Sequence, residues 1–166
     1  MEPDFFIRLV DRHAAALELF AGQWTVAPAD VVQESLLELC RQDPLPERIV
    51  PWLYKVVRNK AISAARSENR RRRHEATAAG RCERWFEPAP DAAFDAALAT
   101  EALHELPDEE REIIVAHVWG GLSFEEIADA FDTSSSTAHR RYQAGLAALR
   151  ERLGVTWLVN TGPKPG

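Results

Sequence analysis

The chain has 166 residues, 46% of them hydrophobic, which suffices for one domain or two small ones with a packed core. No apolar run approaches the roughly 18 residues of a membrane span, and the N-terminus, with Glu2 and Asp4, lacks a signal-peptide pattern, so we expect a cytoplasmic protein without membrane insertion. The net charge of −6 argues against a protein that binds bulk DNA indiscriminately.

The positive charge is concentrated in one segment. Residues 55–73 hold eight Lys and Arg residues against one acid, Glu68, so the rest of the chain is strongly acidic. This distribution favours a protein that reaches DNA within a larger assembly, where another component supplies most of the phosphate attraction. The two cysteines, Cys40 and Cys82, are too isolated for a disulfide framework or a zinc site, and we expect Cys40 to be a small core residue.

The periodic segments are all helical, which predicts an all-α protein. The first helix is expected over about Asp4–Ala21, the second from Pro28 or Asp30 to before Pro44, and the third from near Pro51 through the basic segment. Their buried faces are predicted to contain Phe6, Leu9, Val10, His13, Leu17 and Phe20 in the first helix, Val32, Leu36, Leu39 and Cys40 in the second, and Leu53, Val56, Val57, Ala61, Ile62 and Ala65 in the third.

The second helix carries an acidic stripe. Asp30, Glu34 and Glu38 recur every four residues beside Gln33, although neighbouring like charges on a helix are unfavourable. An ordinary solvated face is one explanation. The other is a docking face for a cationic partner, with apolar neighbours such as Val32 at the centre of the contact.

The third helix interleaves aromatic side chains with cations and an amide. Aromatic rings can stack on unpaired bases while cations hold the backbone, so this face suits opened DNA strands better than intact duplex. Trp52 could equally be a core residue, and the charges could simply be solvated. The residues concerned are Trp52, Tyr54, Lys55, Arg58, Asn59, Lys60 and Arg66.

A linker is predicted at 76–95, where the helical pattern gives way to Gly80, Pro88 and Pro90. It separates a domain at 1–75 from a second at 96–154, and a flexible tail follows at 155–166. Trp85 and Phe86 within the linker could pin it to this molecule or dock on a partner. The second domain is expected to begin with helices over about Ala92–Glu105 and Pro107–Trp119, the latter closed by Gly120 and Gly121.

The segment Leu122–Arg150 has the layout of a helix-turn-helix. Ser123 and Glu126 form a capping box, Asp132 tolerates a left-handed conformation at the turn, and Ser134 can cap the next helix. Capped helix pairs also occur in ordinary bundles, so DNA binding is not required by this segment alone. The second helix divides into an apolar face with Ala138, Tyr142, Gly145, Leu146, Leu149 and Leu153, and a polar face with Ser136, Arg140 and Gln143 flanked by His139 and Arg141.

Taken together, these motifs resemble the sigma-70 family of bacterial RNA polymerase sigma factors, in particular the short extracytoplasmic-function (ECF) type. Asp30–Glu34 is similar to the family's core-binding motif, and the stretch from Trp52 to Arg66 to its promoter-melting and −10-element helix. Leu106–Pro107, Arg111–Glu112 and Gly121–Arg150 are similar to the domain that reads the −35 element. The chain departs from the family at Ser63, usually aspartate, and at Ala144, Leu146, Ala147 and Ala148, which are commonly basic.

The resemblance implies a sigma factor that binds core RNA polymerase, through the clamp helices of its largest subunit and its flap, and promoter DNA. An anti-sigma factor is a further candidate partner. The implied core-binding residues are Asp30, Val32, Gln33, Glu34 and Glu38; those for −10 single-stranded DNA are Trp52, Tyr54, Lys55, Arg58, Asn59, Lys60 and Arg66; those for the −35 element are Ser134, Ser136, Thr137, His139, Arg140, Arg141 and Gln143.

Two other classes of function are alternatives to a sigma factor. A helix-turn-helix regulator acting without polymerase would bind duplex DNA by itself and would not need the acidic stripe. An enzyme is disfavoured because no two histidines have ligand spacing, no paired carboxylates share a cleft signature and no glycine-rich phosphate loop is present. We therefore expect no catalytic residues, no metal site and no cofactor.

Overall fold

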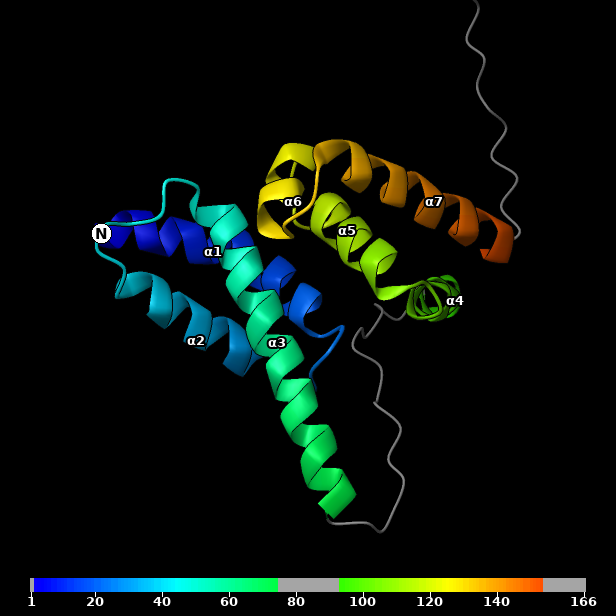
Figure 1. Ribbon diagram of the computed structural model, residues 1–166, viewed down its shortest axis with the longest axis horizontal. Helices are drawn as coiled ribbons and strands as arrows, with labels where there is room; N and C mark the ends of the chain where they lie inside the picture. The colour runs from blue at the N-terminus through cyan, green and yellow to red at the C-terminus, as the bar shows by residue number, and fades with distance from the viewer. Residues whose placement is uncertain (1, 75–92, 154–166) are drawn as a thin grey trace, which may run out of the picture.

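The computed structural model describes residues 2–74 and 93–153, and every regular element in these two segments is an α-helix (Figure 1). The predicted all-α class is confirmed. The tail 155–166, most of the predicted linker, Cys82, Trp85 and Phe86 lie outside the described residues. None of the described helices combines the length and the apolar character that a bilayer crossing requires. Residues 2–74 are called the first half below, and 93–153 the second half.

The first half contains three helices: α1 (Pro3–Ala21), α2 (Pro28–Cys40) and α3 (Ile49–His74). A proline in the first turn begins both α1 and α2, where its missing N–H is not needed for the helix. The long C-terminal part of α3 extends beyond α1 and α2 (Figure 1). The predicted inner faces are buried at Leu9, Leu17, Phe20, Val32, Leu39, Leu53, Val57 and Ala61, and partly exposed at Phe6, Val10, His13, Leu36, Val56, Ile62 and Ala65.

The second half contains α4 (Ala93–His104), α5 (Asp108–Val118), α6 (Phe124–Ala130) and α7 (Ser135–Leu153). The capping box predicted at the start of α6 is confirmed: the Glu126 N–H donates to Ser123 Oγ over 3.2 Å, and the Ser123 N–H donates to the Glu126 carboxylate over 2.8 Å. Asp132, between α6 and α7, has a φ of 52°, as its expected left-handed conformation requires. Local sequence signals therefore set the start of the first helix and the turn of the helix-turn-helix.

The two halves pack against each other around a shared hydrophobic core. In this core α1 contacts α5, and α3 contacts α6. Figure 1 shows α5 and α6 lying against α1 and the N-terminal part of α3. One continuous cluster joins Phe20, Leu53 and Val57 of the first half to Val115 and Ile127 of the second. The two-domain division of the chain remains a proposal, because the apolar surfaces of both halves are buried together.

The expectation that Cys40 lies in the core is wrong. Cys40 is exposed. It is the last residue of α2, where the chain leaves the helix through Arg41. Cys40 lies at helical spacing from Leu36 and directly after Leu39. The packing that covers Leu36 partly and Leu39 fully does not extend to Cys40.

Candidate nucleic-acid interface

The acidic stripe of α2 divides into exposed and buried residues. Asp30, Gln33 and Glu34 are exposed, and Glu38 is half-buried. Val32 is only 2% exposed and belongs to the core. The exposed acids can meet a partner, whereas Val32 supports the helix from inside and offers no contact surface.

The acidic stripe and the basic helix are not separate surfaces. Lys60 on α3 lies between two acids of α2, with its Nζ 3.0 Å from Glu38 Oε2 and 3.8 Å from Glu34 Oε2. These ion pairs link the two helices at a place where helical spacing alone had suggested independent faces. A polyanion approaching Lys60 would have to compete with both carboxylates.

The two aromatic residues of α3 that were candidates for stacking on bases differ in burial. Trp52 is half-buried and packs against the core. Tyr54 is fully buried, and its hydroxyl has no hydrogen-bond partner within the described part of the chain. Burial raises the pKa of the Tyr54 hydroxyl well above its usual range. A base therefore cannot reach Tyr54 in this arrangement, and its assignment to the DNA-contacting set is corrected to a packing role.

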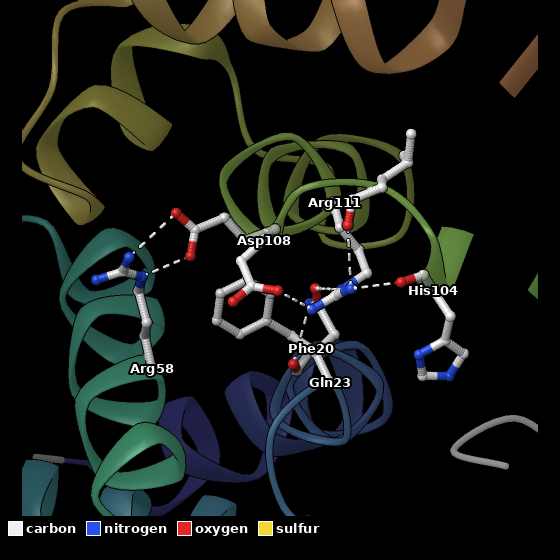
Figure 2. Close-up of polar contacts among 8 residues, drawn as sticks. Phe20, Gln23, Arg58, His104, Asp108 and Arg111 are labelled. Carbon is white, nitrogen blue, oxygen red and sulfur yellow. Dashed lines mark hydrogen bonds and ion pairs between the residues drawn. The ribbon is translucent and has the colours of Figure 1, made fainter. Parts of the chain in front are cut away.

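The cations at the N-terminal end of α3 are engaged by the second half. Arg58 makes two hydrogen bonds to the Glu112 carboxylate, with Nε 2.6 Å and Nη2 3.2 Å from its oxygens. Figure 2 shows Arg58 reaching from α3 toward α5 in this contact. Lys55 Nζ lies 2.7 Å from Asp132 Oδ1, and Arg48 pairs with Asp129. Of the predicted single-strand set, Asn59 and Arg66 remain exposed on α3.

Glu112 is the most deeply buried acid in this network, at 3% exposure. Burial raises the pKa of its carboxyl above the usual value, and the hydrogen bond and positive charge of Arg58 oppose that shift. A buried carboxylate is costly unless it is paired and hydrogen-bonded. Glu112 therefore depends on Arg58, a residue of the other half.

Arg111 forms a second polar link between the halves. Its guanidinium donates to Gln23 Oε1 over 3.3 Å, to the carbonyls of His104 and Leu106 over 3.1 and 3.3 Å, and to Asp108. Gln23 in turn donates to the Phe20 carbonyl over 3.1 Å. Figure 2 shows Arg111 pointing from α5 toward Gln23 at the end of α1. Arg111 thus donates hydrogen bonds to acceptors at the C-terminal ends of two helices, α1 and α4.

The residues predicted for the −35 element fall into two groups: exposed side chains, and side chains that are bonded within the second half. Ser136, His139, Arg140 and Gln143 are exposed on α7. Ser134 and Thr137 are engaged in the helix cap, where the Thr137 N–H donates to Ser134 Oγ over 3.1 Å and the two hydroxyls lie 2.9 Å apart. Arg141 points back to α5, with Nη2 2.5 Å from Glu109 Oε2. The helix-turn-helix therefore presents four polar side chains outward.

A shallow hollow lies beside this surface, between the N-terminal ends of α6 and α7. It is lined by Ser123, Phe124, Glu125, Ser135, Ser136 and His139. The His139 ring meets Phe124 edge-on, with centroids 5.0 Å apart, which fixes its orientation. Among the described residues, no group of three or more His, Cys, Asp or Glu side chains could hold a metal ion.

Comparison with known proteins identifies the family. The chain is 34% identical over 161 residues to the ECF RNA polymerase sigma factor SigL of Mycobacterium tuberculosis, a match that covers 89% of this chain and 90% of the relative. The chain belongs to the ECF family of RNA polymerase sigma factors. A second relative, the RNA polymerase sigma factor CarQ of Myxococcus xanthus, is 32% identical over 162 residues, with 91% of this chain and 90% of the relative covered. The sequence-based resemblance is thereby confirmed.

The family model "Sigma-70, region 4" matches residues 97–149, from α4 to α7. This places the helix-turn-helix of the ECF chain within the family's DNA-binding region 4. Proteins of this family act in transcription, and region 4 binds DNA.

Solved structures share the fold of this ECF chain. The sigma factor RpoE from Bartonella quintana, crystallised with the anti-sigma factor NepR, gives a TM-score of 0.76 at 24% identity, covering 93% of this chain and 99% of that one. CnrH, in complex with the cytosolic domain of CnrY, gives a TM-score of 0.63 at 23% identity, covering 92% and 90%. At these identities the likeness concerns the fold.

The residue sets predicted for binding core polymerase, the −10 strand and the −35 element contain none of Glu112, Asp129, Asp132 and Gln23. A signal was present for Glu112: Arg111 and Glu112 directly precede the apolar run Ile113–Ala116. Charges beside a buried run are usually paired, because an unpaired buried charge is costly. The partner, Arg58, lies 54 residues away in the sequence, and that pattern does not identify it.

Proposed function

We propose that the protein binds core RNA polymerase and directs promoter-specific initiation of transcription through −10 and −35 recognition. The observation that carries the proposal is the likeness to ECF sigma factors over nearly the full chain. The protein would act in the cytoplasm as a specificity subunit and would catalyse no reaction itself. That likeness does not favour the alternative of a helix-turn-helix regulator that works without polymerase.

Core binding is assigned to the acidic stripe of α2. Asp30, Glu34 and Glu38 with Gln33 form a negatively charged ridge suited to a cationic surface such as the clamp helices of the polymerase largest subunit. Val32 supports this ridge from the core. The flap of the polymerase is the proposed contact of the second half.

DNA binding is assigned to two surfaces. On α3, the proposed contacts to the opened −10 strand are Trp52, Lys55, Arg58, Asn59, Lys60 and Arg66. On α7, Ser136, His139, Arg140 and Gln143 would face the −35 major groove, with Ser134, Thr137 and Arg141 holding the recognition helix in place. Arg and Gln suit bidentate contacts to guanine and adenine.

An anti-sigma factor is a proposed further partner. RpoE of Bartonella quintana, whose fold this chain shares, was crystallised with one. Co-purification from cells followed by mass spectrometry would identify polymerase subunits and any such inhibitor together.

The decisive test is transcription with core polymerase reconstituted from purified subunits. Glu34→Lys should weaken core binding by roughly tenfold or more, because it places a like charge against the cationic partner surface. Asp11→Lys, which makes the same charge change at an exposed position of α1, is the matched control. Binding to fluorescently labelled core enzyme measures both. Equal affinities of the two variants, or no promoter-dependent transcript from any genomic fragment with the parent protein, would contradict the proposal.

Base reading by α7 gives a separate prediction. Arg140→Ala should reduce discrimination among −35 sequences by about 1–3 kcal/mol if Arg140 makes a bidentate guanine contact. The measurement compares the affinities of the holoenzyme for a set of −35 variants at fixed salt. A loss that is uniform across all sequences would instead assign Arg140 to phosphate contact.

A further inference from the structure

A cluster of four aromatic rings joins α5, α6 and α7, which contact one another (Figure 1). The rings belong to His117 of α5, Phe124 of α6, and His139 and Tyr142 of α7. His117 stacks on Phe124, with centroids 4.5 Å apart and planes 17° from parallel. The Tyr142 centroid lies 4.9 Å from that of His117 and 5.4 Å from that of Phe124. The rings therefore hold one another in position across three helices.

The cluster is anchored to the backbone at one end. His117 Nδ1 lies 2.6 Å from the Leu122 carbonyl oxygen, and because a carbonyl only accepts, Nδ1 carries the proton and donates. Leu122 is only 1% exposed and belongs to the core, against which Phe124 also packs. The position of the Phe124 ring is thus set from the interior of the protein.

The opposite end of the cluster is an exposed side chain of the recognition helix. The ring of His139 lies at 88° to that of Phe124, with centroids 5.0 Å apart. The other outward side chains of α7, Ser136, Arg140 and Gln143, contact no ring in the described part of the chain. A side chain that is held before binding loses less conformational entropy when it meets its partner. His139 is therefore the pre-oriented member of the proposed −35 surface.

The surroundings of His139 favour contact with a base edge over contact with a phosphate. Glu125 lines the same hollow as His139, so a phosphate placed there would meet a carboxylate. A neutral imidazole offers one N–H donor, and the major-groove edge of either purine presents N7 as an acceptor. One donor held in a fixed direction matches one such acceptor.

We propose that His139 donates a hydrogen bond to the N7 atom of one purine in the −35 element, and that Phe124 is the positioning residue that aims the His139 ring. This inference rests on the proposed function, because His139 meets a base only if α7 enters the −35 major groove. It adds Phe124, which does not belong to the residue set assigned to the −35 element, to the determinants of specificity.

The test removes the proposed acceptor atom and leaves base pairing unchanged. The full chain is assembled with core polymerase, and the probe is a labelled promoter duplex from a genomic fragment that the parent transcribes. One −35 purine at a time is replaced by its 7-deaza analogue, in which a C–H group takes the place of N7. At one purine the parent should bind the 7-deaza probe roughly three- to tenfold more weakly than the unmodified probe, as expected for the loss of one hydrogen bond. His139→Ala should bind these two probes equally.

The same ratio of affinities tests the positioning role, and because it compares two probes with one protein, it does not depend on the fraction of that protein that is folded. Phe124→Leu removes the ring beside His139 and should bring the ratio close to that of His139→Ala. Phe124→Tyr keeps the ring and should retain the ratio of the parent. The matched control is Phe131→Leu, the same substitution at the other end of α6, in a ring that stacks on Phe20.

An N7 effect in His139→Ala as large as that of the parent, or the absence of any −35 purine whose N7 matters to the parent, would overturn the base contact. Equal ratios in Phe124→Leu and Phe131→Leu would overturn the positioning role. Transcription of the unmodified promoter by the parent tests the proposed function independently. A parent that transcribes but shows no N7 effect contradicts only this inference, whereas a folded parent that transcribes no genomic fragment contradicts the proposed function itself.

Discussion

Replacing Arg111 with methionine should lower the free energy of unfolding by about 3–5 kcal/mol. The side chain is only 7% exposed, and its guanidinium is the donor for Gln23 Oε1 and for two backbone carbonyls. Methionine fills similar space but donates no hydrogen bond, so three acceptors lose the hydrogen bond from Arg111. Each buried polar group left unsatisfied costs about 1–3 kcal/mol. Asp108, which is largely exposed, can recover water and adds little to the loss.

The control is Arg141→Met, the same chemical change on a neighbouring helix. Arg141 pairs with Glu109 near the surface, where side-chain exposures are 32% and 62%. Such a pair is expected to contribute less than about 1 kcal/mol. Urea denaturation followed by tryptophan fluorescence measures both variants, and equal losses in the two would contradict the role given to Arg111.

The structural features that could be predicted are those whose cause is local in sequence. Ser123 and Glu126 are three residues apart, and their capping box follows from helix geometry alone. The positive φ of Asp132 likewise follows from the need to reverse the chain between two periodic segments. The polar face of α7 was predicted in the same way, because the alternation of apolar and polar residues along one helix fixes which residues lie together.

The features that could not be predicted depend on which helix packs against each face of another helix. A helical wheel of α3 separates its faces but does not indicate that α6 packs against one of them. Tyr54 was therefore assigned to DNA although it is buried beside Gly120 of the second half. Lys60 was assigned to a free basic face although Glu34 and Glu38 of α2 flank it. Residues that pack or form ion pairs across tens of residues of sequence produce no periodic pattern in either segment.

The aromatic cluster at the boundary of the halves shows how far the fold depends on such non-local packing. Phe20 is fully buried near the end of α1 and contacts three other rings: Tyr54 at 4.9 Å between centroids, Trp24 at 5.1 Å and Phe131 at 5.6 Å. One side chain thus packs on α3 in its own half and on the turn after α6 in the other. The position of Phe20 on the predicted buried face of the first helix predicts its burial, but it does not predict the contact with Phe131.

Phe20→Ala should accordingly lower the free energy of unfolding by about 3–5 kcal/mol, since it removes a fully buried ring and leaves a cavity that neighbouring rings cannot fill completely. Phe5→Ala on the same helix is the control, because Phe5 is 38% exposed and its removal costs far less transfer free energy. Urea denaturation monitored by tryptophan fluorescence gives both values, and similar losses would contradict the central place of Phe20. Because the core is continuous across the two halves, Phe20→Ala should destabilise both halves together. We expect one unfolding transition with a lower urea midpoint, and the same midpoint in fluorescence and in far-UV circular dichroism.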